Sequence, residues 1–149
     1  MRSALLRLTI CCLIAAVAHA ACPSNEWRPF RGKCYYASSF AVGGWNISEI
    51  CNFGYPGSKS ASVHDIDVNS FLASDMLGGQ RAWMGLYRQP GYSYFHWEDG
   101  SSLDWTFWYS FPSGTYEECA AINYYAPTGQ WAGMSCGTPL PFLCETYET

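Results

Sequence analysis

Cysteine content constrains the fold of this chain more than any other feature of its sequence. The 149 residues include eight cysteines, two of which, Cys11 and Cys12, lie in an apolar N-terminal segment. The other six follow at Cys22, Cys34, Cys51, Cys119, Cys136 and Cys144. An even number of cysteines in a secreted domain is typical of a disulfide framework, and six cysteines allow 15 pairings. We therefore expect a disulfide-bonded domain whose pairing the spacing alone leaves open.

The first 20 residues have the form of a secretory signal peptide. Arg2 and Arg7 supply positive charge, an apolar run follows over 8–17, and Ala18-His19-Ala20 matches the small-x-small pattern of a cleavage site. A membrane-spanning helix needs about 20 apolar residues, and this run is shorter. We therefore expect residues 1–20 to be removed and a secreted, extracellular protein to remain. Residues 21–149 have a length typical of one domain.

Composition excludes several classes of partner and cofactor. Aromatic residues make up 17% of the chain and charged residues 13%, which favours a large buried core over disorder. The net charge is −4 and the only lysines are Lys33 and Lys59, so we expect no nucleic-acid binding. The six cysteines contain no CxxC pair, and only His64 and His96 follow the signal segment. A zinc site is therefore not expected.

Two helices are predicted in the first half of the domain. The first covers about 45–52, where Asn46 and Glu49 have the spacing of a capping box. The second is indicated by apolar residues at 68, 71, 72 and 76, with Asp67 as a possible N-cap. Because most of the later chain lacks a helical period, helices and strands should occupy different parts of the sequence. This order predicts an α+β domain.

Short strands and one long loop account for the rest of the chain. Arg31-Gly32 has the composition of a hairpin turn. The aromatic-rich stretch 102–118 shows no steady period and predicts a long, partly structured loop. Alternating or aromatic segments bounded by turn residues predict strands at 27–30, 34–38, 82–87, 92–97, 119–123, 130–134 and 140–145.

The segment W-M-G-L at 83–86 resembles the W-I-G-L signature of C-type lectin-like domains. Further matches follow the family's order and spacing: Trp45 ahead of Cys51, S-A-S-V at 60–63, W-E-D-G at 97–100, E-E-C at 117–119, W-A-G-M-S-C at 131–136 and F-L-C-E at 142–145. Each motif is weak by itself, but their order along the chain is specific. The resemblance extends from Cys22 to about Glu145 and implies the long form of the fold. In that fold, two helices pack on short antiparallel sheets beside a long loop region.

The resemblance also implies a disulfide pairing. It pairs Cys51 with Cys144, Cys119 with Cys136, and Cys22 with Cys34. The first of these bridges ties the first helix to the last strand, so the two ends of the domain should lie close together. The four tryptophans at 83, 97, 108 and 131 match family positions that build the core.

The calcium ligands of sugar-binding family members are largely missing. The family supplies oxygen donors on both sides of a loop proline, in an Asn-Asp pair after the late tryptophan, and in an acid before a cysteine. Here Pro112 lies between Phe111 and Ser113, and Ala132 and Gly133 follow Trp131. Only Glu117 matches a ligand position. Because calcium takes six to eight oxygen ligands, we expect no bound calcium and no other cofactor.

The aromatic residues of the long loop are the candidate ligand contacts. We predict Trp105, Phe111 and Tyr116 as anchors, with Ser113 and Glu117 as polar groups that orient the ligand. Tyr124 and Tyr125 lie near a later turn and are further candidates. The alternative is that these aromatic side chains fill a small core beneath the loop. The sequence leaves both interpretations open.

These features predict a secreted binding protein that recognises glycans or glycoproteins without calcium. The alternative is a calcium-independent scaffold for protein contacts, of the matrix, venom or immune type. We do not expect an enzyme, because neither the adjacent carboxylates Glu98-Asp99 nor Ser62 near His64 has the pattern of a catalytic site. Asn46-Ile47-Ser48 is a potential N-glycosylation sequon. Ligand identity and oligomeric state do not follow from the sequence.

Overall fold

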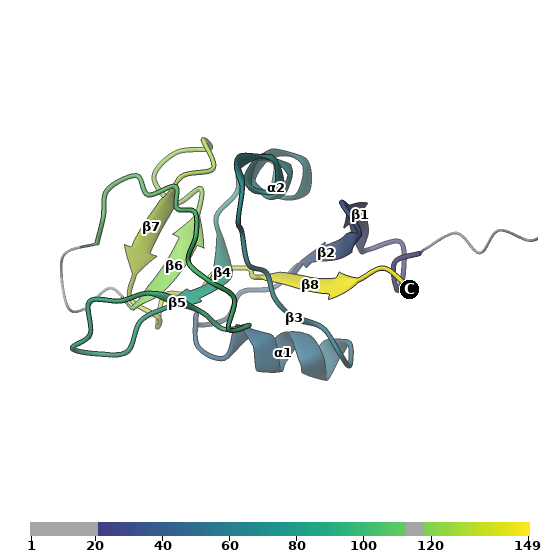
Figure 1. Ribbon diagram of the computed structural model, residues 1–149, viewed down its shortest axis with the longest axis horizontal. Coiled ribbons are helices and arrows are strands. Elements are labelled where there is room, and N and C mark those ends of the chain that lie inside the picture. The colour runs from purple at the N-terminus through teal and green to yellow at the C-terminus, as the bar shows by residue number, and fades with distance from the viewer. Residues whose placement is uncertain (1–20, 113–117) are drawn as a thin grey trace, which may run out of the picture.

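The computed structural model describes residues 21–112 and 118–149, which form two small antiparallel sheets with helices packed against them (Figure 1). The predicted signal segment and three of the predicted ligand residues, Ser113, Tyr116 and Glu117, lie outside this range. The first sheet has the strand order β1-β2-β8-β3 and the second has the order β5-β4-β6-β7. The architecture is α+β, as predicted.

The first sheet brings both ends of the domain together. Its strands are β1 (Arg28–Phe30), β2 (Lys33–Ala37), β3 (Lys59–Ser60) and β8 (Leu143–Tyr147). Arg31 and Gly32 connect β1 and β2 with φ angles of 50° and 80°, as a hairpin turn of primed type requires. The Ala21 amide donates to the Thr149 carbonyl over 2.9 Å, so the ends of the domain are adjacent, as expected.

The second sheet carries the long loop. Its strands are β4 (Ala82–Tyr87), β5 (His96–Trp97), β6 (Cys119–Ile122) and β7 (Trp131–Met134). The predicted strand at 92–97 is shorter in the structure, because Tyr92 closes a turn by donating to the Gln89 carbonyl. Only the last two residues of that segment pair with β4. The Trp83 amide donates to the Pro141 carbonyl over 2.8 Å and links β4 to the chain entering β8.

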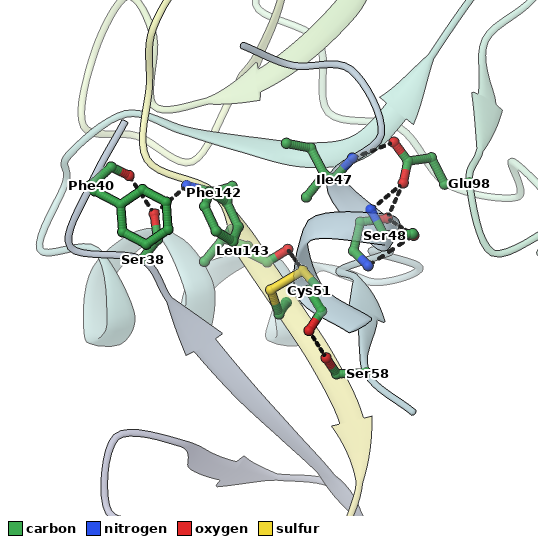
Figure 2. The surroundings of a disulfide bond; sticks show 11 residues. Ser38, Phe40, Ile47, Ser48, Cys51, Ser58, Glu98, Phe142 and Leu143 are labelled. Carbon is green, nitrogen blue, oxygen red and sulfur yellow. Dashed lines mark hydrogen bonds between the residues drawn. A yellow bond between two sulfur atoms is a disulfide. The ribbon is translucent and has the colours of Figure 1, made fainter. Parts of the chain in front are cut away.

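Both predicted helices are present, but neither is capped by the predicted side chain. Helix α1 spans Ile47–Gly54, and Asn46 at its N-cap makes no side-chain capping bond. The Glu98 carboxylate caps it instead, accepting from the Ile47 amide over 3.2 Å and the Ser48 amide over 2.7 Å (Figure 2). A carboxylate at a helix N-terminus is favoured both by the unpaired amides and by the helix dipole.

The second helix begins two residues earlier than an N-cap at Asp67 would place it. Helix α2 spans Ile66–Ser70, and Asp65 caps it by accepting from the Val68 amide over 2.9 Å. The chain continues without a break into η1 (Phe71–Met76), which has π-type hydrogen bonding. The two helical segments bury Val68, Phe71 and Leu72 against the sheets, in agreement with the apolar positions that predicted them.

The three disulfides pair as the family resemblance implies. They join Cys22 to Cys34, Cys51 to Cys144, and Cys119 to Cys136. The second bridge attaches α1 to β8 (Figure 2), and the third connects β6 to the segment after β7.

Buried side chains form two clusters. The larger lies between α2, η1 and the two sheets, and it contains Trp97 and Trp131. The smaller surrounds Trp83 and contains the buried disulfides Cys51–Cys144 and Cys119–Cys136. Trp83, Trp97 and Trp131 are at most 2% exposed, as predicted for core residues. Trp108 is half-buried and packs against the larger cluster.

Candidate functional site

The long loop is attached to β7 along its described part. The Trp131 amide donates to the Phe107 carbonyl over 2.8 Å, and the Tyr109 amide donates to the Trp131 carbonyl over 2.9 Å. The rings of Trp105 and Trp108 meet the buried Trp131 ring edge-on, with centroids 5.5 and 5.7 Å away. Backbone and aromatic contacts therefore hold the loop at one strand of the second sheet.

The two predicted anchors that the structure describes differ in burial. Trp105 is half-buried and stacks on Phe107 in addition to its contact with Trp131. It therefore belongs to the small core beneath the loop that was the alternative interpretation. Phe111 is 59% exposed, and among the residues that the structure describes its aromatic contact is with Trp108, with centroids 6.0 Å apart. The contact of either residue with a ligand stays a prediction.

The residues after the late tryptophan do not fit a calcium site. Ala132 and Gly133 lie in β7, both are buried, and neither has a side-chain oxygen. Phe111, on the other side of the loop, also lacks an oxygen donor. Within the described ranges, no group of three or more His, Cys, Asp or Glu side chains has an arrangement that could hold a metal ion. The donor set that calcium needs is therefore missing from these positions.

A polar network lies beneath the turn that follows β5. Asp99 accepts from the Ser62 hydroxyl over 2.6 Å and from the Ser101 amide over 2.8 Å, and Lys59 lies 3.7 Å away. Burial raises the pKa of Asp99, but the hydrogen bonds from Ser101 and Ser62 and the charge of Lys59 outweigh it, so the pKa lies below its usual value. Asp99 is therefore ionised near neutral pH.

The network also contains a serine–histidine–aspartate sequence that resembles a catalytic triad. His64 Nδ1 lies 2.7 Å from Asp104 Oδ1, and His64 Nε2 lies 3.2 Å from the Ser62 hydroxyl. A nucleophilic serine must give its proton to the histidine. Here the ionised Asp99 accepts only, so Ser62 donates to it, and Ser62 is itself 3% exposed. This geometry is that of a structural hydrogen-bond network.

A buried ion pair joins the network to the first sheet. Glu145 in β8 is 1% exposed, and its carboxylate accepts from the Ser62 amide over 2.8 Å. The ammonium of Lys33 in β2 lies 2.5 Å from the other oxygen of that carboxylate. One carboxylate oxygen accepts hydrogen bonds, and the other has no hydrogen-bond partner in the described chain but is compensated by the charge of Lys33, as a buried carboxylate requires.

The other predicted residues lie on exposed segments. Tyr125 is 57% exposed, and Tyr124 is half-buried with the Arg81 guanidinium 4.5 Å above its ring centre. Asn46 is exposed and its side chain does not cap α1, so its amide is accessible to a glycan. Glycosylation there stays a prediction. Among the described helices, none combines the length and the apolar character needed to span a membrane.

Comparison with known proteins agrees with the fold and its motifs. The family model described as "Lectin C-type domain" matches residues 27–146. Lectin BRA-3 of Megabalanus rosa is 32% identical over 132 residues, which cover 86% of this chain and 80% of the relative. Rheacalcin-2 of Rhea americana is 25% identical over 134 residues, covering 82% and 94% of the two chains.

Solved structures share the same fold. A calcium-independent type II antifreeze protein superimposes with a TM-score of 0.78 at 19% identity, covering 88% of this chain and 98% of that one. At this identity the likeness concerns the fold alone. The same family is indicated by the family match, by the pairing of the three disulfides and by the two-sheet architecture. The chain therefore belongs to the C-type lectin domain family.

Proposed function

We propose that this protein is a secreted, non-enzymatic binding protein that recognises glycans or glycoproteins without bound calcium. The observation that carries this proposal is the loop on β7. Aromatic side chains line the loop, and the strand behind it has Ala132 and Gly133 where sugar-binding members of the family supply oxygen donors. Aromatic rings bind the apolar faces of sugars by stacking and do not need a metal.

Several further observations support parts of this proposal. The relative from Megabalanus rosa is named a lectin, and one structural neighbour is described as calcium-independent. Secretion is supported by the form of residues 1–20 and by the three disulfides, which form in oxidising compartments. The non-enzymatic part of the proposal is supported by the Ser62 hydroxyl, which donates its proton to the Asp99 carboxylate.

Calcium is expected to change neither stability nor binding. A ligand present at a hundredfold excess over its dissociation constant stabilises a native state by about 2.7 kcal/mol. We therefore expect the same melting temperature in millimolar calcium and in chelator, and the same pattern of bound sugars on a glycan array in both buffers. A rise in melting temperature that chelator reverses would contradict the calcium-independent assignment.

Phe111→Ala is expected to weaken glycan binding by about 1–3 kcal/mol with little change in melting temperature, because this side chain is exposed. Trp105→Ala should weaken binding and also lower the melting temperature, because Trp105 packs on Trp131. Phe53→Ala, which removes a phenylalanine that is 92% exposed on α1, is the matched control. Unchanged glycan binding by Phe111→Ala would remove this residue from the site.

A protein-binding scaffold is the second candidate function. A pocket of about 240 Å³ between α1 and the first sheet is bordered by Phe40 and Phe53, which are 53% and 92% exposed. Apolar side chains gathered at one exposed place are typical of protein contacts. A blank glycan array, together with capture of a specific extracellular protein that Phe53→Ala abolishes, would favour this function over the first.

A further inference from the structure

A second concave surface lies between the segment that follows η1 and the connection from β6 to β7, and it adjoins the long loop where Tyr109 packs on Tyr125. This groove has a volume of about 450 Å³. Its walls are formed by residues 79–81 and 123–127, and Leu140 and Pro141 complete it. The described part of the long loop contributes no residue to its lining.

Asn123 fixes the two walls of the groove relative to each other. Its side chain is 2% exposed, donates to the carbonyls of Ala73 and Gln80 over 3.0 Å each, and accepts from the Gly129 amide over 2.8 Å. The two donated bonds join the β6–β7 connection to η1 and to the segment after it, and the bond from Gly129 lies within the connection. The groove is therefore preorganised, which reduces the entropy cost of ligand binding.

The walls also touch directly at a glycine. Gly79 has a φ of 82°, and a Cβ atom added there would lie 2.6 Å from Pro127 Cβ. This approach is too close for any residue with a side chain, so a glycine is needed both for its conformation and for the contact. The direct contact strengthens the conclusion that the groove has a defined shape.

Among the described residues that line the groove, Arg81 is the one with a charged side chain. The side chain is exposed and stacks on the Tyr124 ring, with its central carbon 4.5 Å from the ring centre. It makes no ion pair or hydrogen bond with the rest of the described chain. Other cations are engaged: Arg31 with Asp65 and Asp67, Lys33 with Glu145, and Lys59 with Asp99. Arg81 thus keeps its planar donor fork available in a protein of net negative charge.

An exposed tyrosine lies beside the ring on which this guanidinium stacks. The Tyr125 ring is 57% exposed and meets the Tyr124 ring edge-on, with centroids 5.1 Å apart. Its other neighbour is Tyr109, at 5.0 Å, so the ring is held from two sides. A fixed ring next to a guanidinium suits a ligand that has both a flat, weakly apolar face and an anionic group.

We infer that this groove binds an anionic saccharide. The Arg81 guanidinium binds the sulfate or carboxylate group through paired hydrogen bonds, and the sugar ring lies on Tyr125. Tyr124 holds the guanidinium in place by stacking beneath it. The inference does not depend on the proposed function of the long loop, because neither Trp105 nor Phe111 lines the groove.

Titration of the intact secreted protein with four simple sugars tests the inference. N-acetylglucosamine 6-sulfate and N-acetylglucosamine form one pair, and glucuronic acid and glucose form the other. We expect each anionic sugar to bind about tenfold more tightly than its neutral parent at low salt, a difference typical of a charge-assisted hydrogen bond. The pairs also distinguish a sulfate from a carboxylate as the preferred group. Equal affinity within both pairs would overturn the inference.

Variants at Arg81 test whether this residue causes the preference for anionic sugars. Arg81→Gln should abolish the preference for the anionic sugar, and Arg81→Lys should reduce it, because an ammonium lacks the planar fork. Arg28→Gln is the control for general charge, since Arg28 is another exposed arginine stacked on a ring, that of Phe71, outside the groove, although its guanidinium also donates to the Asp75 carbonyl. Loss of the preference in Arg28→Gln would assign the binding to general charge. Persistence of the preference in Arg81→Gln would assign it to another site.

The long-loop site is measured in parallel through Phe111→Ala. Loss of neutral glycan binding in Phe111→Ala, with an unchanged anionic preference, would support two separate sites. An anionic preference that Phe111→Ala abolishes would overturn the inference and leave the proposed function standing. If the wild-type protein binds no neutral glycan but keeps the preference that depends on Arg81, the proposed long-loop site fails and the groove remains.

Discussion

Trp131→Ala is expected to lower the free energy of unfolding by about 3–5 kcal/mol, as for other fully buried tryptophans. The side chain is 0% exposed, and its ring contacts Trp97, Trp105 and Trp108. Its indole N–H also donates to Asn69 Oδ1 over 2.8 Å. Truncation would leave a large cavity and an unpaired buried amide oxygen, which costs about 1–3 kcal/mol where it is not resolvated.

The Trp131 substitution should also disturb the loop, because Trp105 and Trp108 lose the surface on which they pack. Denaturant unfolding followed by tryptophan fluorescence and by circular dichroism measures the stability. Trp131→Phe is the graded control, since it retains a ring but not the N–H donor, and we expect it to cost less. Phe53→Ala should leave stability nearly unchanged, because that side chain is 92% exposed. A Trp131→Ala protein as stable as the wild type would contradict the packing described for β7.

Replacement of Cys51 and Cys144 by alanine is expected to have a comparable effect. The bridge spans a sequence separation of 93 residues. The chain-entropy model assigns a loop of this length about 4.7 kcal/mol, through the freedom that the unfolded chain regains. Both sulfurs also lie in the buried cluster around Trp83, so packing is lost in addition. We expect a large fall in melting temperature and incomplete folding at physiological temperature.

The Cys22–Cys34 bridge is the internal control for this effect. Its separation is 12 residues, for which the same model gives about 3 kcal/mol. Cys22 is only partly buried, so the packing loss is also smaller. The double alanine variant at Cys22 and Cys34 should therefore be the more stable of the two. The reverse order would show that native-state strain, and not loop length, controls the contribution of these bridges.

The elements that the sequence predicted well are those whose signals are local. The strand at 82–87 has the predicted boundaries, since its residues are apolar on both faces and turn residues bound it. The turn at Arg31-Gly32 is also correct, because only a few residue types tolerate positive φ there. β3 was missed, because two residues that pair only with β8 carry no periodic signal.

The capping of α1 shows why other features could not be predicted. Asn46 and Glu49 have the spacing of a capping box, but the carboxylate that caps the helix comes from Glu98, 51 residues after Ile47. A side chain brought in by the second sheet competes with the local one, and no window of sequence contains both. The same reason applies to Trp105, whose burial depends on its contact with Trp131 in β7.

The sequence by itself determined the family, the α+β class, the pairing implied for the six cysteines and the lack of oxygen donors at Phe111, Ala132 and Gly133. These properties depend on residue type and order, which the chain carries directly. The tertiary structure decided which aromatic side chains are buried, which carboxylate caps α1, and that Arg81 lies beside Tyr124 and Tyr125 in one groove. Arg81 and Tyr124 are 43 positions apart in the chain, and strand pairing between β4 and β6, together with the Asn123 hydrogen bonds, brings them together. Exposure and proximity are properties of the folded surface, because packing between distant segments creates them.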